Sequence, residues 1–413
     1  MLPALRSLDF MPSPLLDRPG LLIRDPFRFS EATLIIPPAL VQCLTLFDGA
    51  HTEPELREHL VRLTGDLDVG PLLRHLIETL SEAGFLEDEH FRRRKEVAEQ
   101  SFAEAPLRAA AHAGSAYPAT AADLQTTLAQ YLDGALSKAG PGADGPVAAI
   151  AAPHVSPFGG VKAYRAAYSA LSPADADRTF VILGTSHYGQ PGRIALTRKS
   201  FATPFGEAIT DTAIVDRLAT EAGEGALMED YCHAIEHSIE FQVVFLQHLF
   251  GPQVRIVPIL CGSFLYASLR SAPGFQQDGA PEADDRVRRA LGALGELAAR
   301  EGNRLLWVLG VDMAHMGKRY GDSLNARAGQ DEMQAVELRD RDRIERMEQG
   351  DAQGFWERVV EHRDDDLKWC GSAPIYAFLR AMPRARGKLL HYQQWNIDES
   401  SVVSFAGVRF HSN

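Results

Sequence analysis

Closely spaced cysteines are absent from the sequence. Its 413 residues include only four, Cys43, Cys232, Cys261 and Cys370, and no two of them form a C-x-x-C pair. A disulfide framework needs cysteines that can cross-link a small core, and an oxidising compartment in which the bonds persist. The scatter of the four residues therefore argues against a disulfide-stabilised secreted domain and favours a reduced, cytoplasmic protein.

Long apolar runs and an excess of positive charge are also lacking. Runs such as 147–152 (VAAIAA) have the length of a strand, whereas a membrane span needs about 20 apolar residues. The first residues lack the apolar core of a signal peptide. With 42 basic against 55 acidic side chains, the formal net charge is −13. Because nucleic acids and anionic membranes are bound by basic surfaces, the sequence argues against both as main partners.

The length and composition are those of a globular protein with more than one domain. At about 150 residues per domain the chain is long enough for two or three. A content of 45% hydrophobic and 23% charged residues argues against disorder. Residues 1–90 are predicted to form a small winged-helix-like module, residues 91–110 a linker with a solvated basic cluster at 92–95, and residues 111–413 the main domain.

The N-terminal module is predicted from short strands and capped helices. Residues 21–29 and 32–36 have strand character, Thr52 and Glu55 have the spacing of a capping box before a helix, and 85–86 suits a closing strand. This order resembles winged-helix modules that recognise peptides in radical-enzyme systems. A stabilising or dimerising appendage is the alternative interpretation.

Buried strands and amphipathic helices alternate through the main domain. This alternation predicts an α/β fold with a largely parallel central sheet, because parallel strands are covered by helices on both faces. The strands are expected at 147–152, 179–183, 255–261, 304–310 and 401–407, and helices at 122–133, 161–170, 234–250, 284–300 and 333–348.

Three histidines each follow a predicted strand within a few residues. They are His154, His187 and His315. Asp312 lies between the third strand and His315. Ligands of open α/β sheets bind beyond the carboxyl ends of the strands, where several loops meet. Imidazole is the commonest metal ligand and the usual base near neutral pH, so the three histidines predict a metal or acid–base site. A single histidine in such a position would be an ordinary surface or capping residue.

Cys370 is the fourth candidate for this site. It precedes a predicted helix at 375–382 that Ser372 is placed to cap, and the positive end of that helix would favour a thiolate. A thiolate beside imidazoles suits Zn, Fe or Cu, whereas Mg and Ca prefer oxygen ligands. A buried structural cysteine is the alternative, as it is for the other three cysteines. Metal-independent hydrolysis through Cys370 and His315 is a further alternative.

A different metal site is suggested by residues 233–237. Their sequence, HAIEH, has the H-x-x-E-H pattern of inverted zincins, in which two histidines and a glutamate share one face of a helix. Glu240 would extend this face. Spacing alone does not supply the remaining glutamate ligand of a zinc protease, so both sites stay open at this point.

Six motifs, in order along the chain, resemble the Memo family, which includes the bacterial proteins called AmmeMemoRadiSam system protein B. The resemblance covers residues 105–413. The motif EHSIE at 236–240 is unchanged, and the others are similar to H-A-G-S-W-Y, P-H-A-G-Y with S-G, L-G-P-S-H, D-x-C-H-W-G and C-G-R-x-P-I. In this sequence they are 112–118 (HAGSAYP), 152–154 (APH) with 158–160 (FGG), 183–187 (LGTSH), 312–317 (DMAHMG) and 370–375 (CGSAPI).

The resemblance implies a fold related to the LigB-type class III extradiol dioxygenases. It places metal ligands at His154, His187 and Cys370 and an acid–base pair at Asp312 and His315. One Fe or Cu ion is implied, with Zn as an alternative, and with it a metal-dependent oxidoreductase. The dioxygenases have a glutamate where the Memo proteins have the cysteine, which argues against ring cleavage.

Neighbouring residues and partners also follow from the resemblance. Glu236, His237 and Glu240 become pocket residues around the metal ligands, which displaces the zincin interpretation. The system name implies a radical SAM protein and an AMMECR-type protein as partners, and a small molecule or peptide as ligand. A non-catalytic binding role has also been assigned to the family, so a scaffold with a vestigial dioxygenase pocket is the alternative function.

The sequence departs from the family pattern around the predicted site. The loop after His154 reads V-S-P instead of A-G-Y, Ser372 stands in place of an arginine, and Ala116 and Met316 replace tryptophans. These changes remove an aromatic hydroxyl and a cation suited to an anionic substrate. All three predicted metal ligands are retained, so the changes concern the substrate rather than metal binding.

Overall fold

The structure is a computed structural model that describes residues 1–15, 17–133, 146–265, 279–362 and 365–412. The chain divides into two compact units, Met1–Ala105 and Pro106–Asn413, and each has its own hydrophobic core. No helix within the described ranges combines the length and the apolar character needed to cross a bilayer.

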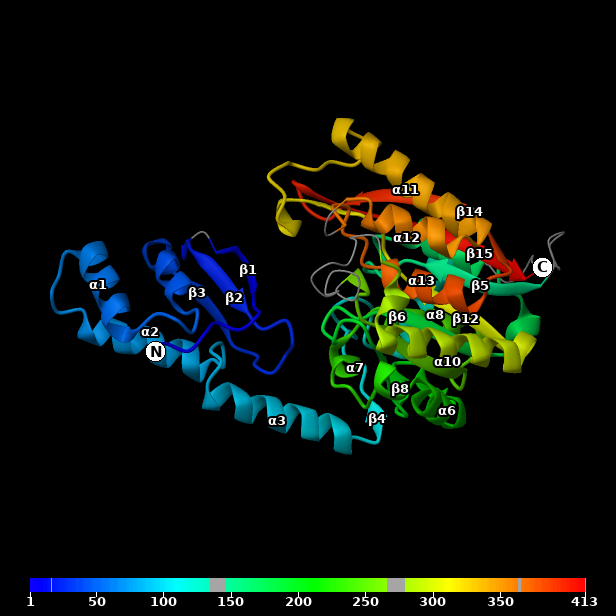
Figure 1. Cartoon of the computed structure of the whole chain (residues 1–413), viewed down its shortest axis with the longest axis horizontal. Helices are drawn as coiled ribbons and strands as arrows, with labels where there is room; N and C mark the ends of the chain where they lie inside the picture. Colours follow the sequence, from blue (N-terminus) through cyan, green and yellow to red (C-terminus); the bar gives the residue numbers. More distant parts are fainter. Residues whose placement is uncertain (16, 134–145, 266–278, 363–364, 413) are drawn as a thin grey trace. The chain divides into compact units, whose positions relative to one another are not determined.

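The N-terminal unit contains a three-stranded antiparallel sheet and four helical segments (Figure 1). Its core includes Ile23, Leu80 and Phe85. Helix α1 begins with the predicted capping box, in which the Thr52 amide donates to the Glu55 carboxylate at 2.7 Å. The elements are β1 (Asp9–Pro12), β2 (Leu21–Arg24), β3 (Thr33–Ile36), η1 (Pro38–Leu46), α1 (Glu53–Thr64), α2 (Gly70–Glu82) and α3 (Glu89–Glu104).

This unit differs from the predicted module in its strand order and in its last helix. All three strands precede the helices, and the expected closing strand is a single bridge between Leu86 and Leu5. Residues 91–110, expected as a linker, lie largely in α3, which Asp88 caps by accepting a hydrogen bond from the Phe91 amide. The basic cluster lies on the exposed surface of α3, where ion pairs one turn apart offset its charge.

The second unit is built on a mixed sheet with a parallel centre. Strands β5, β12, β6 and β11 lie side by side in that order and are parallel, whereas β15 and β14 extend the sheet in antiparallel fashion. The strands are β4 (Leu107–Arg108), β5 (Val147–Ala152), β6 (Thr179–Thr185), β7 (Ile194–Leu196), β8 (Ser200–Thr203), β9 (Gly206–Thr210), β10 (Ala226–Met228), β11 (Arg255–Cys261), β12 (Leu305–Gly310), β13 (His315–Gly317), β14 (Ala385–Asn396) and β15 (Ser401–Ser412).

Helices cover both faces of this sheet (Figure 1). Side chains alternate between two cores, so that Ile182 and Val308 enter one and Val181 and Leu309 the other. Helices α4, α5 and α8 cover the first face, and α6, α10, α11, α12 and α13 the second. Burial on both faces explains the continuous apolar strands and confirms the predicted α/β fold with a largely parallel sheet. The longer helices are α4 (Ala121–Leu132), α5 (Val161–Tyr168), α6 (Thr212–Ala222), α8 (Glu240–Phe250), α10 (Asp285–Glu301), α11 (Asp331–Gln349), α12 (Ala352–Val360) and α13 (Ser372–Ala381).

The register of the central strands aligns their carboxyl ends. Gly310 of β12 pairs with both Ala152 of β5 and Gly184 of β6, so the three strands finish in one row. The loops that follow them carry predicted site residues and leave the sheet at the same edge. The parallel pairing therefore brings together side chains that are far apart in the sequence.

The predicted helix 234–250 is two helices, α7 (Cys232–Ile235) and α8, with a turn between them. Helix α7 ends immediately before Glu236, whose backbone is extended (φ −72°, ψ 138°). In this turn Ser238 approaches the sheet so closely that a Cβ atom on Gly310 would lie 2.2 Å from the Ser238 carbonyl oxygen. Residues 233–237 therefore do not share one helix face, which removes the structural basis of a zincin site.

Two buried carboxylates tie α11 to the segment before Cys370. Asp340 accepts hydrogen bonds from Trp369 Nε1 at 2.7 Å, and from hydroxyl groups on β14 and β15. Asp365 accepts one from the Trp369 amide at 3.0 Å and pairs with the buried Arg343. Burial outweighs these hydrogen bonds at Asp340 and raises the pKa of its carboxyl to about 6.

This pKa makes a prediction for stability. Aspartate in an unfolded chain has a pKa near 3.9, so the folded state binds the proton of Asp340 more tightly. The stabilisation is fully present below about pH 4 and is lost as the pH rises through 6. Relative to Asp340→Asn, we expect the wild-type free energy of unfolding to fall by about 2–3 kcal/mol between pH 4 and 7 in urea titrations. Asp331→Asn, an exposed change on the same helix, should keep the wild-type slope; the same slope in Asp340→Asn would contradict the prediction.

Candidate metal centre

Three predicted ligands converge at the carboxyl edge of the sheet. His154 follows β5, His187 follows β6, and Cys370 lies in the turn before α13. Their ligand atoms lie within 4.8 Å of one another, and Cys370 Sγ is 3.3 Å from His154 Nε2. His154 is buried, Cys370 is half-buried and the His187 side chain is 28% exposed. The group is therefore accessible to solvent at His187.

The second nitrogen of each imidazole is bound by an acceptor. His154 Nδ1 lies 2.9 Å from the Gly310 carbonyl oxygen, and His187 Nδ1 lies 3.1 Å from both carboxylate oxygens of Glu236. Because these oxygens only accept, the hydrogen is on Nδ1, and Nε2 is the nitrogen available to a metal ion. Metal-ligating histidines normally have this arrangement, in which an outer partner orients the ring.

Cys370 is positioned by the backbone of its turn. Thr185 Oγ1 donates to the Cys370 carbonyl oxygen at 3.1 Å, and the Gly371 amide donates to the Asp312 carbonyl oxygen at 3.1 Å. A Cβ atom on Gly371 would lie 2.7 Å from that oxygen, so this close approach requires glycine. The predicted cap is wrong in detail: Gly371 occupies the N-cap of α13, and the Ser372 hydroxyl donates to a backbone carbonyl of the turn.

The electrostatics of the group favour an ionised thiol. Burial alone would raise the pKa of Cys370, but His154 and His187 outweigh it and lower this pKa to about 7. At His187 burial is outweighed by Glu236 and Cys370, which raise its pKa well above the ordinary value. Burial lowers the pKa of His154, so its ring is neutral at pH 7. Two imidazoles and a thiolate fit a first-row transition metal such as Fe, Cu or Zn.

Glu236 organises the surroundings of His187. Its buried carboxylate accepts hydrogen bonds from the His187 and His237 amides, both at 2.8 Å, and lies 3.1 Å from His237 Nδ1. The rings of His187 and His237 are stacked with centroids 5.1 Å apart. Burial opposes ionisation, but the two histidines hold the pKa of Glu236 well below its ordinary value. The structure thus places Glu236 and His237 directly beside the three ligands.

Asp312 and His315, the predicted acid–base pair, border the group, and their side chains are bound by other partners than each other. Asp312 accepts a hydrogen bond from the His154 amide at 2.9 Å, and its other oxygen is 3.5 Å from His154 Nε2. His315 Nδ1 lies 2.8 Å from the Met313 carbonyl oxygen and 3.1 Å from that of Lys368. These carbonyls, rather than Asp312, fix the tautomer of His315 and leave its Nε2 as an acceptor.

The ionisation of this pair suits proton transfer. Burial raises the pKa of Asp312 to about 6, although His315 and the backbone amides of His154 and Val155 oppose the shift. Burial likewise lowers the pKa of His315, against the influence of Asp312. His315 is therefore neutral at pH 7, with an unprotonated Nε2 that can accept a proton. Tyr320 packs edge-on against this ring, with centroids 4.9 Å apart.

The side chains of Glu240 and His233 are bound by groups other than the three predicted ligands. The Glu240 carboxylate is fully buried in an ion pair with Arg108 and accepts the hydroxyl of Tyr117. It also accepts the amide of His112 at 3.0 Å, so it attaches the segment before α4 to α8. His233 Nε2 lies 3.0 Å from a backbone carbonyl of β7. Both residues support the fold around the site.

A cavity of about 300 Å³ opens beside His187 and Cys370. Its other walls include Phe264, Trp356 and Lys368, which none of the sequence motifs singled out. The Lys368 ammonium group donates to Asp322 at 2.7 Å. Proximity to Cys370 in the sequence is the one signal that points to Lys368, whereas the aromatic walls come from segments without any motif.

The fold and the site define an α/β protein with a histidine–cysteine group at the carboxyl edge of a largely parallel sheet. The sequence matches the family described as Memo-like protein over residues 108–272 and 282–409. The match covers well over half of the chain. The protein therefore belongs to the Memo family.

Relatives in bacteria and archaea are similar over long stretches. A MEMO1 family protein of Aquifex aeolicus is 24% identical over the full length of both chains. MEMO1 family proteins of Thermococcus kodakarensis and Pyrococcus furiosus are each 31% identical, over 74% and 63% of this chain and 99% and 86% of their own lengths. About a quarter of this chain lies outside the Thermococcus match, and the N-terminal unit makes up about a quarter of the chain.

Replacing Glu236 tests the support that it gives to His187. In Glu236→Gln one oxygen becomes an amide group that cannot accept, so the His187 ring loses its fixed orientation. We expect Co²⁺ affinity, followed through the thiolate absorption bands, to fall about 10- to 100-fold. Glu207→Gln, an exposed change on β9, is the matched control and should bind as the wild type does. Equal affinity in all three proteins would show that Glu236 does not orient the site.

Proposed function

We propose that this Memo-family protein binds one Fe or Cu ion through His154, His187 and Cys370 and uses it in oxidoreductase chemistry. The observation that carries the proposal is the convergence of two Nε2 atoms and a sulfur, with each Nδ1 already held by an acceptor. A thiolate with imidazoles selects against Mg and Ca, and Zn is the alternative ion. Three protein ligands leave a coordination position free for substrate or water.

His315 is the base in this proposal, and Asp312 is its electrostatic partner. A bound redox metal would supply electron exchange and polarise a coordinated oxygen. The unprotonated Nε2 of His315 takes a proton from the substrate, and the nearby Asp312 stabilises the resulting imidazolium. The cavity beside Cys370 holds the substrate against Phe264 and Trp356, which keep water away from it.

The ring-cleaving dioxygenases have a glutamate at the position of Cys370. The sulfur ligand therefore distinguishes this proposed site from theirs. The resemblance to the Memo family supports a role for this protein in an AmmeMemoRadiSam system, with a radical SAM protein and an AMMECR-type protein as partners. The substrate in that setting is a small molecule or a peptide.

Metal content tests the proposal directly. Protein from cells supplied with Fe and Cu should contain about one ion per chain, with an anomalous signal at the corresponding absorption edge between His154 and Cys370. Cys370→Ala should lose most of the metal, because removal of the thiolate leaves only two ligands. Cys43→Ala, a buried cysteine of the N-terminal unit, is the matched control and should retain it. Equal metal in both variants would remove Cys370 from the site.

The role of His315 is tested by measuring metal content and oxygen uptake together. His315→Gln should keep the metal and lose oxygen uptake supported by ascorbate by at least about 100-fold, the usual contribution of a general base. Loss of metal from this variant would instead identify His315 as a ligand. Unchanged oxygen uptake would exclude it as the base.

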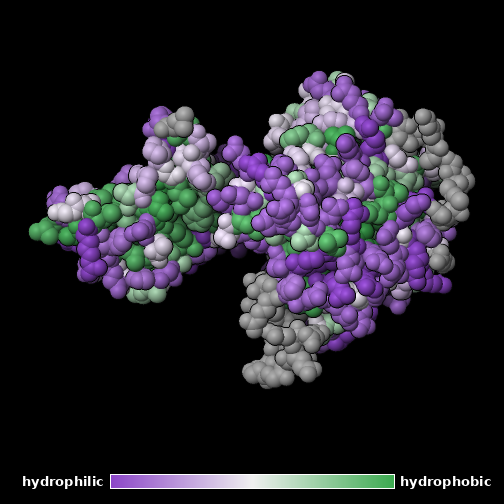
Figure 2. Space-filling view, turned by 90° about the horizontal axis from the view of Figure 1, so that it is seen from above, coloured by the Kyte–Doolittle hydropathy of each residue, from purple (hydrophilic) through white to green (hydrophobic). Residues whose placement is uncertain are grey.

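A second candidate function is non-catalytic binding through the N-terminal unit. This unit has its own core, and the domain that carries the metal ligands corresponds in size to whole archaeal relatives. Apolar side chains reach its surface (Figure 2), among them Phe10, Leu67 and Val97, which are 48%, 78% and 63% exposed. Figure 2 shows apolar surface gathered over this unit, and a contiguous apolar patch favours contact with a protein or peptide.

Removal of the N-terminal unit distinguishes the two functions. The full chain, tagged and recovered from its native host, should bring down the radical SAM and AMMECR-type proteins, whereas residues 106–413 alone should not. Metal content should be the same in both. Equal recovery of the partners by the shortened chain would assign their binding to the Memo domain and reject the role of the N-terminal unit.

A further inference from the structure

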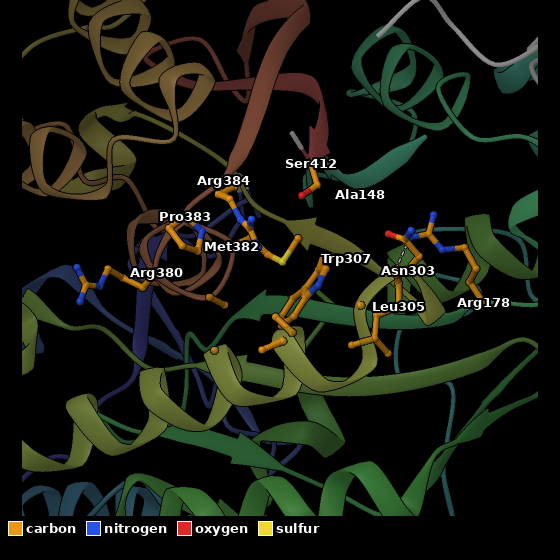
Figure 3. Close-up of a pocket in the computed structure, with 15 residues that line it drawn as sticks. Ala148, Arg178, Asn303, Leu305, Trp307, Arg380, Met382, Pro383, Arg384 and Ser412 are labelled. Atoms are coloured by element: carbon orange, nitrogen blue, oxygen red, sulfur yellow. Dashed lines mark hydrogen bonds between the residues drawn. The ribbon is translucent and has the colours of Figure 1, made fainter. Parts of the chain in front are cut away.

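A second cavity, of about 420 Å³, lies at the opposite end of the sheet from the predicted metal ligands. Its walls include residues at the beginnings of β5 and β12, whereas the metal ligands follow the carboxyl ends of strands. Figure 3 draws the residues that line it, Trp307 and Met382 among them. Its volume is within the range of small-ligand pockets, and it shares no lining residue with the cavity beside Cys370.

Small residues of α10 create this space. Gly295, Ala298 and Ala299 face the cavity where larger side chains would fill it. A Cβ atom added to Gly295 would meet no other atom within 4 Å. The helix itself gains nothing from this glycine, since glycine is less favourable than alanine inside a helix. The cavity is thus kept open at the expense of helix stability.

The charged side chains that line the cavity are all positive. Its described lining contains three arginines, Arg178, Arg380 and Arg384, and no acidic side chain. Arg380 extends away from the cavity and pairs with Glu282 at 2.8 Å. In the described part of the chain, Arg384 has no acidic partner and no side-chain hydrogen bond. An exposed guanidinium group without a partner leaves a net positive charge at the rim of the cavity.

Arg178 and Asn303 form a polar end to the same cavity (Figure 3). Arg178 is largely buried, and its terminal nitrogens donate to Asp175 at 3.0 Å and to carbonyl oxygens at the starts of β5 and β12. Its buried Nε has no hydrogen-bond partner among the described residues. This Nε has almost no accessible surface, so at this end of the cavity Asn303 is the donor that a ligand can reach.

We propose that this cavity binds a small organic acid. The carboxylate or phosphate of the ligand pairs with Arg384, and its apolar body lies against Trp307, Met382 and the small residues of α10. An oxygen at its far end accepts a hydrogen bond from the side-chain amide of Asn303. This site is separate from the proposed metal site, and neither depends on the other.

The simplest probes carry one acidic group on an apolar ring. Benzoate and phenyl phosphate, titrated into the full-length protein and followed by ligand-detected NMR, should bind. Benzamide, which has nearly the shape of benzoate without its charge, should bind at least tenfold more weakly, since hydrogen bonds to charged groups contribute about 1.5–3 kcal/mol. No detectable binding of either acid, or equal binding of benzoate and benzamide, would overturn the proposal.

Two pairs of variants locate the site. Gly295→Leu places a side chain in the cavity and should abolish binding of all three probes, whereas Gly292→Leu, on the same helix and also without neighbours within 4 Å, should not. Arg384→Gln should weaken benzoate about tenfold and leave benzamide unchanged. Arg380→Gln removes a charge already paired with Glu282 and should have less than a twofold effect. Equal effects within either pair would place the probes elsewhere and reject the site.

Discussion

The parallel register of β5, β12 and β6 is the constraint on which the candidate metal centre depends. Gly310 pairs with Ala152 on one side and Gly184 on the other, so the three strands end level with one another. His154 and His187 follow within three residues of these paired positions and have little freedom to separate. A slip of one residue in any of these strands would turn its following loop toward the other face of the sheet.

Hydrogen-bond acceptors orient the imidazole rings that the strand register brings together. His154, His187, His237 and His315 all have Nδ1 within hydrogen-bond distance of a carbonyl or carboxylate oxygen. Two of these acceptors belong to the buried Glu236, an ion that the interior tolerates only because charged and polar groups surround it. The site therefore depends on a second layer of contacts that is as well defined as the ligand set.

The sequence was informative where one local signal sufficed. Continuous apolar runs predicted the buried strands, and motif order pointed to His154, His187 and Cys370. Strand β14 was missed because its half-exposed residues show no apolar run. The break between α7 and α8 was missed because it arises from contact of Ser238 with Gly310, and the pairing of Glu240 with Arg108 also depends on a distant segment. Contacts between remote segments have no signature in residue spacing.

The two cavities differ in charge, and this difference separates their ligands. Ser372, which stands where the family pattern has an arginine, lines the cavity of the candidate metal centre. Lys368 lines the same cavity and supplies a cation from a different backbone position. Asp322 accepts its ammonium group at 2.7 Å, so little net charge remains to attract an acid. At the other end of the sheet, Arg384 has no such partner among the described residues. The ion pair thus leaves little net charge on Lys368 in the cavity of the candidate metal centre, whereas Arg384 leaves a positive charge at the rim of the opposite cavity.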